Sequence, residues 1–253
     1  MNLPPQFTGG LPVQKRTYQD LLALLGVNGA HPGGFLHTKR LLQKLQIQQN
    51  WTVLDAGCGS GLTSSYLVRA YGCAVTALDL NPLMIRNARR RFTQERLTVQ
   101  LIQGDIEKLP LQNSAFDLIV AESVTVFTDI HKSLSEYARV LKPGGRLLDL
   151  EMTVESTLAG TELQELSQFY GMNNIPTESE WIQFFKQSGF TIESIEGASV
   201  SKTAGSLDVT NSHLDDIKDQ ELLRIWSKHQ ELTEKYAHTL GYRQFQASLP
   251  GND

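Results

Sequence analysis

The sequence contains little cysteine, no excess of basic charge and no long hydrophobic run. Two cysteines in 253 residues, Cys58 and Cys73, exclude a disulfide framework and favour a reducing compartment. A formal net charge of −4 gives no overall basic field toward nucleic acid or an anionic membrane. No apolar run is long enough to span a bilayer, and nothing at the N-terminus resembles a signal peptide. We therefore expect a cytoplasmic protein that binds neither membrane nor nucleic acid.

Metal-site spacing is also missing, because no His, Cys or Asp cluster has the pattern of a ligand set. We therefore expect no bound metal. One basic cluster is present, and it is interpreted as a solvated outer helix face because no aromatic residues are interleaved with it. Its members are Arg86, Arg89, Arg90, Arg91 and Arg96. The chain length suits one α/β domain with additions.

The most informative stretch runs from Trp51 to Gly61 and reads Trp-Thr-Val-Leu-Asp-Ala-Gly-Cys-Gly-Ser-Gly. Its apolar beginning predicts a buried strand, and residues 62–71 after it predict a helix. Between them, alternate positions are glycine, which lets the backbone turn sharply and approach a ligand. These glycines are Gly57, Gly59 and Gly61. Strand, glycine turn and helix together open a nucleotide-binding βαβ unit.

The spacing of this turn differs from the dinucleotide fingerprint G-x-G-x-x-G, because the third glycine comes one residue early. An acid, Asp55, also precedes the first glycine by two positions. Its charge would repel a pyrophosphate and would suit a cationic amine. Cys58 lies within the turn and is interpreted as a small residue that fits there. A second acid, Asp79, ends the next apolar stretch at the distance expected of a ribose-binding carboxylate.

Apolar stretches alternate with helical ones along most of the chain, which predicts a doubly wound sheet with right-handed crossovers. The predicted strands cover residues 51–54, 73–79, 97–103, 116–120, 146–152, 190–196 and 241–249. The last of them alternates like an edge strand. The predicted helices cover 17–25, 35–45, 62–71, 82–92, 130–141, 162–170, 178–188 and 213–240.

Several segments in order resemble the class I S-adenosylmethionine (SAM)-dependent methyltransferases. The resemblance spans residues 53–150 and involves the glycine turn, Asp79, Gly104-Asp105-Ile106, Phe116 to Val120, and Arg139 to Gly145. It implies a Rossmann-like, seven-stranded mixed α/β sheet with an antiparallel last strand. Residues 1–46 would form an arm and helical lid, residues 47–152 the SAM-binding core, and residues 153–253 the substrate side, all within one domain.

The resemblance also implies SAM as cofactor, S-adenosylhomocysteine as product, and a set of residues that hold them. Asp55 would act near the methionine amino group, Asp79 would bind the ribose, and Asp105 would meet the exocyclic amine of adenine. The full expected set is Asp55, Gly57, Cys58, Gly59, Gly61, Asp79, Leu80, Gly104, Asp105, Ile106 and Glu122.

The catalytic candidates are less well defined. Glu122 follows the fourth predicted strand directly, and His31 lies in a glycine-rich loop that could pass over the ligand end of the sheet. Equally, Glu122 could position SAM or bind nearby backbone amides. Glu151 and Tyr170 are further candidates, and His131 is interpreted as exposed. Aromatic side chains could face the sulfonium or simply pack. These are Tyr18, Phe127 and Phe169.

We therefore expect an enzyme that transfers methyl from SAM to nitrogen or oxygen, in preference to carbon, of a small-molecule acceptor. No Asn-Pro-Pro-aromatic segment or additional cysteine set favours a DNA or arsenite acceptor. The alternatives are an NAD-dependent Rossmann oxidoreductase and a SAM-binding regulatory protein without turnover. Both a monomer and a homodimer are compatible with the sequence.

Overall fold

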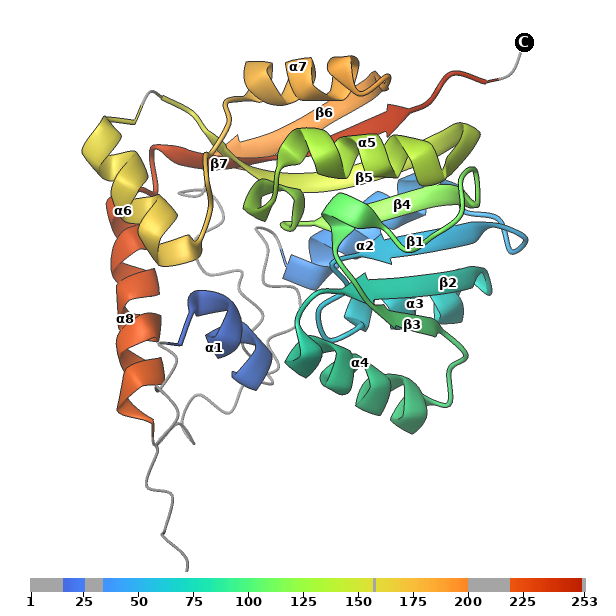
Figure 1. Ribbon diagram of the computed structural model, residues 1–253, viewed down its shortest axis with the longest axis horizontal. Helices are drawn as coiled ribbons and strands as arrows, with labels where there is room; N and C mark the ends of the chain where they lie inside the picture. The colour runs from blue at the N-terminus through green and yellow to red at the C-terminus, as the bar shows by residue number, and fades with distance from the viewer. Residues whose placement is uncertain (1–15, 26–33, 157, 200–218, 252–253) are drawn as a thin grey trace, which may run out of the picture.

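Figure 1 shows a computed structural model of the protein, which describes residues 16–25, 34–156, 158–199 and 219–251. The described chain forms a seven-stranded sheet with the strand order β3-β2-β1-β4-β5-β7-β6. The strands are Thr52–Ala56 (β1), Ala74–Asp79 (β2), Gln100–Gln103 (β3), Phe116–Glu122 (β4), Leu141–Val154 (β5), Thr191–Ser199 (β6) and Leu240–Ser248 (β7). The predicted α/β class is confirmed.

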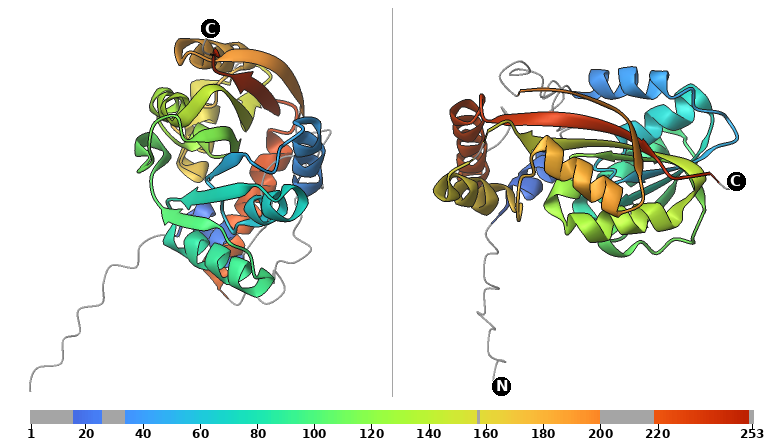
Figure 2. Two further views of the ribbon diagram at one scale, coloured as in Figure 1. Left: turned by 90° about the vertical axis from the view of Figure 1, so that its right-hand side faces the viewer. Right: turned by 90° about the horizontal axis from the view of Figure 1, so that it is seen from above.

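Helices cover both faces of this sheet, as the view from above in Figure 2 shows. Apolar residues of α2 and α3 pack on one face against β1, β2, β4 and β5, and α4 packs beside them against β2. Residues of α5 and α7 pack on the other face. The helices are Tyr18–Leu25 (α1), Gly34–Lys44 (α2), Leu62–Tyr71 (α3), Pro82–Glu95 (α4), Ile130–Val140 (α5), Gly160–Tyr170 (α6), Glu178–Gln187 (α7) and Gln220–Lys235 (α8), with 3-10 turns at Ile106–Lys108 (η1) and Thr125–Phe127 (η2).

The strand order reverses at β1, which lies between β2 and β4 and is parallel to both. The helices that follow these two strands, α3 and α5, therefore lie on opposite faces of the sheet. Ligands of open α/β sheets bind at this switch point. Asp55, Asp79 and Glu122 lie in the last residues of β1, β2 and β4.

The prediction that residues 241–249 form an edge strand was wrong in its position. β7 is antiparallel, as expected, but it pairs with β5 along nine residues and with β6 on its other side. Most of its side chains are buried, including Gln244, which is fully buried. Alternation of polar and apolar residues predicts one solvated face, whereas a strand between two neighbours buries polar groups as well.

Most boundaries agree with the sequence, and one difference has a local cause. The third strand begins at Gln100 instead of residue 97. Arg96, with φ of 55°, still caps α4, because its amide donates to the carbonyl of Thr93 at 3.2 Å. Residues 96–99 lead the chain out of α4, and only after them can β3 pair with β2. The expected helix at 213–240 is observed from Gln220 to Lys235, and residues 213–218 lie outside the described chain.

Helices α1, α6 and α8 stand together beyond the carboxyl ends of the strands, at the left of Figure 1. Aromatic rings join them: Tyr18 of α1 lies 5.0 Å from Tyr170 of α6 and 4.8 Å from His229 of α8, between ring centroids. On α4, the Asn87 amide donates to the carbonyl of Ala23 in α1 at 2.8 Å. We call these three helices the lid.

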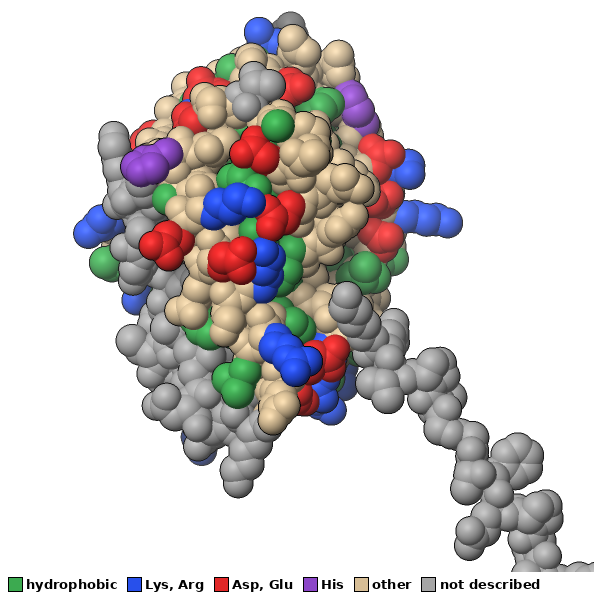
Figure 3. Space-filling model, turned by 90° about the vertical axis from the view of Figure 1, so that its left-hand side faces the viewer, with side chains coloured by type: hydrophobic (Ala, Val, Ile, Leu, Met, Phe, Trp, Pro, Cys, Tyr) green, Lys and Arg blue, Asp and Glu red, His purple; other side chains and the backbone are tan. Residues whose placement is uncertain are grey.

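Figure 3 shows the outer face of the lid, where acidic and basic side chains are interspersed. Glu165 of α6 pairs there with Lys228 and Lys235 of α8, at 2.9 and 2.7 Å. These pairs, with the aromatic contacts inside, hold α6 against α8. No helix among the described residues is both long and apolar enough to cross a bilayer. Within the same residues, no group of three or more potential metal ligands is brought together.

Candidate functional site

The glycine turn lies between β1 and α3, and all three of its glycines have positive φ, between 53° and 79°. A β-carbon added to Gly57 would come 2.5 Å from Val124, and one added to Gly61 would come 2.6 Å from Phe92. A β-carbon on Gly59 would meet nothing within 4 Å. The first and third glycines thus allow close packing within the protein. Gly59 faces open space, where its missing side chain leaves room for a ligand.

Asp79 connects this turn to β2. One carboxylate oxygen accepts from the Gly59 amide at 2.8 Å, and the other accepts from the Asn81 amide at 2.8 Å. Burial raises the pKa of Asp79, and the two amide hydrogen bonds act against that rise. Each carboxylate oxygen can accept a second hydrogen bond, so the group can still take hydroxyl donors from a ribose. The structure thus places Asp79 beside the glycine turn, and its ribose-binding role stays a prediction.

Asp55 is buried beneath the turn, with only 3% of its surface exposed. The Ser64 hydroxyl, in the first turn of α3, donates to its carboxylate at 2.5 Å. Burial, helped by the neighbouring charges of Glu122 and Asp79, raises the pKa of Asp55 to about 7 against the lowering effect of the Ser64 hydrogen bonds. Three carboxyl groups therefore share this end of the sheet. Such an arrangement attracts a cationic ligand and disfavours a pyrophosphate.

Glu122 is the last residue of β4, not the residue after the strand as the sequence suggested. Thr63 of α3 donates to one carboxylate oxygen at 2.6 Å, and Thr38 of α2 donates to the other. Glu122 therefore joins the helix that precedes the core to the helix that follows the glycine turn. Neither threonine was predicted from the sequence. A hydroxyl at the second residue of α3 was the only local signal for one of them.

The predicted adenine segment follows β3. The Gly104 amide donates to the carbonyl of Asp79 at 3.0 Å, which places this segment beside the ribose-binding candidate. Ile106 is buried, while Leu80, in the loop after β2, is 64% exposed. Asp105 is exposed and accepts from the Glu107 amide at 2.9 Å. An exposed apolar side chain near a carboxylate fits a flat heterocycle with an exocyclic amine.

The structure does not support every catalytic candidate. Glu151 is fully buried, and its carboxylate accepts backbone amides of residues 124–126. The Tyr170 hydroxyl is 2.9 Å from Nδ1 of His229, a residue that the sequence did not suggest. His131 is exposed, as predicted, with its ring edge-on to Phe184. His31 lies outside the described residues.

The aromatic candidates act in packing. Tyr18 and Phe169 contact each other in the lid, with ring centroids 5.8 Å apart, and Phe127 packs against the main core. Cys58 is buried, and burial raises the pKa of its thiol well above the usual range. A thiol of this kind is unreactive at neutral pH, which agrees with its interpretation as a small residue of the turn.

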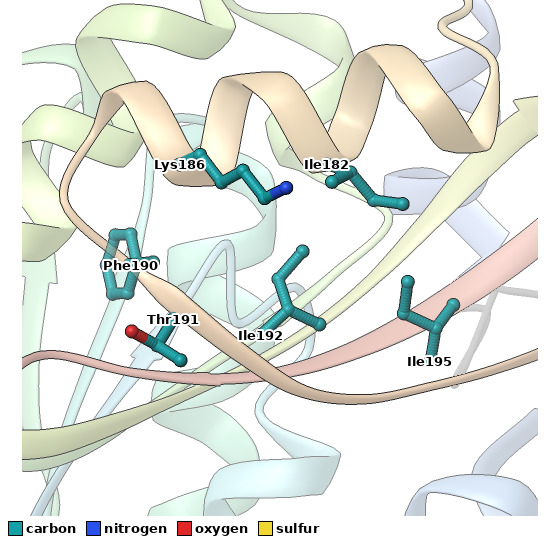
Figure 4. Close-up of a pocket in the computed structure, with 6 residues that line it drawn as sticks. All are labelled: Ile182, Lys186, Phe190, Thr191, Ile192 and Ile195. Carbon is teal, nitrogen blue, oxygen red and sulfur yellow. The ribbon is translucent and has the colours of Figure 1, made fainter.

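A cavity of about 360 Å³ lies elsewhere, between α7 and β6 (Figure 4). It is lined by Ile182, Lys186, Phe190, Thr191, Ile192 and Ile195. Thr191 is the first residue of β6 and is in register, through β7, with Arg146 near the beginning of β5. The cavity therefore begins level with the amino ends of the parallel strands, at the end of the sheet opposite to Asp55, Asp79 and Glu122.

Comparison with known proteins also indicates a methyltransferase. Residues 53–145 match the family model described as a methyltransferase domain. The chain is 38% identical, over 173 residues, to an uncharacterized methyltransferase of Bacillus subtilis (strain 168), covering 68% of this chain and 74% of the relative. It is also 38% identical, over 129 residues, to malonyl-[acyl-carrier protein] O-methyltransferase of Enterobacter lignolyticus (strain SCF1), covering 51% of this chain and 47% of that enzyme.

Among solved structures, phosphoethanolamine N-methyltransferase 2 of Haemonchus contortus has the same fold, with a TM-score of 0.75 and 20% sequence identity. The alignment covers 95% of this chain and 61% of the nematode chain. The chain therefore belongs to the class I SAM-dependent methyltransferases. The alternative of an NAD-dependent oxidoreductase was wrong, in agreement with the early third glycine and the acid that precedes the turn.

Proposed function

We propose that this methyltransferase moves a methyl group from SAM to a nitrogen or oxygen atom of a small-molecule acceptor, by in-line displacement at the carboxyl ends of β1 and β4. The observation that carries the proposal is the convergence of Asp55, Asp79 and Glu122 at the carboxyl ends of the strands, beside a glycine turn in which Gly59 faces open space. Negative charge, a missing side chain and a hydroxyl-binding carboxylate are together suited to a cationic nucleoside.

The residues present fit SAM. Asp79 would accept hydrogen bonds from the ribose hydroxyls, and Leu80 with Ile106 would flank the adenine. The exocyclic amine of the adenine would donate a hydrogen bond to Asp105. Asp55 would contribute its charge near the methionine amino group, and the backbone from Gly57 to Gly61 would pack against the ligand. The remaining predicted residues, Cys58, Gly104 and Glu122, would shape the edges of the same site. SAM, when bound, supplies an activated methyl group on a sulfonium.

The protein's own contribution to such a reaction is orientation and exclusion of water. A neutral amine needs no base, whereas a hydroxyl needs a proton acceptor. Glu122 is a catalytic candidate at the carboxyl end of β4, and both of its carboxylate oxygens accept hydrogen bonds from threonine hydroxyls. We propose that it orients the ligands electrostatically and accepts a proton where the acceptor is a hydroxyl. His31 stays a prediction.

Support for a small acceptor comes from the lid, whose three helices stand beyond the carboxyl ends of the strands and are joined by aromatic contacts. The relatives do not agree on the acceptor atom: one is named an O-methyltransferase and one an N-methyltransferase. We propose that residues 1–46 and 153–253 select the acceptor around the core of residues 47–152, within one domain. Cytoplasmic location, a monomer or homodimer, and the absence of nucleic-acid and membrane partners stay predictions.

Two measurements test the proposal. Calorimetry with SAM, S-adenosylhomocysteine and NAD should show binding of the first two only. Transfer of labelled methyl from SAM should then be measured on a panel of amines, phenols and carboxylates, including a malonyl group on a carrier protein. Tight NAD binding without SAM binding would contradict the cofactor assignment. Transfer to carbon alone would contradict the proposed acceptor atoms.

A further inference from the structure

Two acidic side chains on β5, Asp149 and Glu151, are buried without any exposed surface. Alternate residues of a strand face the same side, so both point toward the face that α5 covers. Burial of a carboxyl group is costly unless hydrogen bonds compensate for the lost water. The pair therefore needs a structural explanation, and its partners supply one.

The partners of Glu151 are three consecutive backbone amides in the connection after β4. Val124 and Thr125 donate to one oxygen at 3.0 and 2.8 Å, and Val126 donates to the other at 3.2 Å. These amides belong to the beginning of η2, where helical geometry leaves N–H groups without intrahelical partners. A carboxylate that accepts several amides is favoured in its ionised form.

Asp149 complements that charge. Burial, and then the neighbouring Glu151 carboxylate, raises the pKa of Asp149 well above its usual range, which favours its protonated form. Burial also raises the pKa of Glu151, and its hydrogen bonds with Asp149 and the three backbone amides act against that rise. The Thr125 hydroxyl lies 3.3 Å from both Asp149 oxygens. The amide hydrogen bonds thus favour the negative charge on Glu151, and the proton of the pair is favoured on Asp149.

Residues 123–127 in turn contact the glycine turn. The Val124 side chain lies against Gly57, where an added β-carbon would come 2.5 Å from Cγ2 of the valine. Ser123 has a φ of 53°, and its amide donates to the Leu150 carbonyl at 2.7 Å. A non-glycine residue in this region of backbone space persists only where its surroundings hold it. The hydrogen bonds of Glu151 hold residues 124–126, which follow Ser123 directly.

We propose that Glu151 is a positioning residue, whose carboxylate fixes Val124 against Gly57 and so sets the shape of the cofactor-binding turn. The role rests on the proposed function, because it concerns the same site. Glu151 acts through the backbone and does not reach the reacting atoms. If Glu151 had a merely structural role, its substitution would lower the free energy of unfolding and leave the cofactor affinity of the folded protein unchanged.

Two isosteric substitutions separate these roles. In Glu151→Gln, the amide nitrogen presents donors to a backbone N–H, and one of the accepting oxygens is lost. In Asp149→Asn, the amide still donates to Glu151 and the charge of Glu151 stays. We expect the affinity of folded Glu151→Gln for S-adenosylhomocysteine to fall by about tenfold, and that of Asp149→Asn to change by less than about threefold.

A third variant, Val124→Ala, tests the same link without altering a carboxyl group and serves where Glu151→Gln does not fold. It removes the side chain that contacts Gly57, and we expect an affinity loss of about threefold to tenfold. The measurements are calorimetry with S-adenosylhomocysteine, circular dichroism for the fold, and amide hydrogen exchange. Exchange at residues 124–126 should be faster in Glu151→Gln than in Asp149→Asn.

The outcomes distinguish the inference from the proposed function. A wild-type protein that binds S-adenosylhomocysteine, with unchanged affinity in folded Glu151→Gln, or in Val124→Ala where Glu151→Gln does not fold, overturns the positioning role alone. A wild-type protein that does not bind it overturns the proposed function and this role with it. Loss of affinity in folded Glu151→Gln, or in Val124→Ala where Glu151→Gln does not fold, with retention in Asp149→Asn, supports both. An equal loss in Asp149→Asn overturns the positioning role.

Discussion

The Thr63 hydroxyl of α3 donates to the Glu122 carboxylate of β4 at 2.6 Å, between residues 59 positions apart in the chain. Thr38 of α2 donates to the other oxygen of the same carboxylate. The charge of Glu122 is therefore held in one place, near Asp55, whose pKa it helps to raise. A charge held in a fixed position acts on a bound cation without a cost of reorganisation.

Replacing Glu122 with glutamine tests the importance of that charge. Glutamine keeps the size and a hydrogen-bonding end, and a threonine hydroxyl can accept from its amide, so we expect the fold to persist. Loss of the charge should weaken SAM binding about tenfold, measured by calorimetry. Glu193→Gln, at an exposed position on β6, is the control and should bind like the wild type. Equal affinity in both variants would show that Glu122 does not act on the cofactor.

A pair of glycine substitutions tests the open space above the turn. Gly59 and Gly189 both have positive φ, 53° and 86°, and an added β-carbon meets nothing within 4 Å at either position. Alanine at each should cost about 1 kcal/mol of stability through backbone strain. We expect only Gly59→Ala to weaken S-adenosylhomocysteine binding, by about tenfold or more, because only there would the methyl group occupy ligand space. Thermal unfolding and calorimetry together separate the two effects.

Asp79 should carry much of the affinity for the ribose. In Asp79→Ala, the Gly59 and Asn81 amides lose their acceptor and the ribose hydroxyls lose theirs, so we expect SAM binding to weaken by at least roughly tenfold. Asp129→Ala is a matched control, because Asp129 also accepts a backbone amide, that of Lys132, but at the beginning of α5. Wild-type affinity in Asp79→Ala would remove this residue from the site.

The pH dependence of the protein should show the raised pKa of Asp55. Its folded-state pKa is about 7, above the ordinary value of 3.8, so the folded state binds more protons between these values. The free energy of unfolding should therefore fall as pH rises from 4 to 7 and then level off. Asp55→Asn removes this loss and should be more stable than the wild type at pH 8, by about 1–3 kcal/mol.

Cofactor affinity should respond to Asp55 in the opposite sense. Ionised Asp55 attracts the ammonium group of the ligand, so binding of S-adenosylhomocysteine should weaken as pH falls from 8 to 6. Asp55→Asn should bind more weakly at pH 8 and show a flatter pH profile. Calorimetry at several pH values checks both statements. A wild-type profile without slope near pH 7 would contradict the involvement of Asp55.

The sequence alone determined the strand, glycine turn and helix of the proposed cofactor site, because local order carries that information. A strand, three alternating glycines and a helix must form a turn, and an acid at the end of the next parallel strand must lie beside it. This places Asp79 against Gly59 with no knowledge of the rest of the fold. The helix at residues 62–71 and the capping of α5 by Asp129 follow from equally local signals.

Only the tertiary structure decided the parts that depend on distant pairing. Thr38 donates a hydrogen bond to Glu122, which is 84 positions away in the chain, and β7 lies between β5 and β6. Glu151, a candidate base in the sequence, accepts hydrogen bonds from backbone amides instead. None of these has a local signal, because hydrogen-bond partners and burial depend on which strands become neighbours. A carboxylate at the end of a predicted strand has the same local sequence pattern whether its side chain faces a ligand or a neighbouring loop.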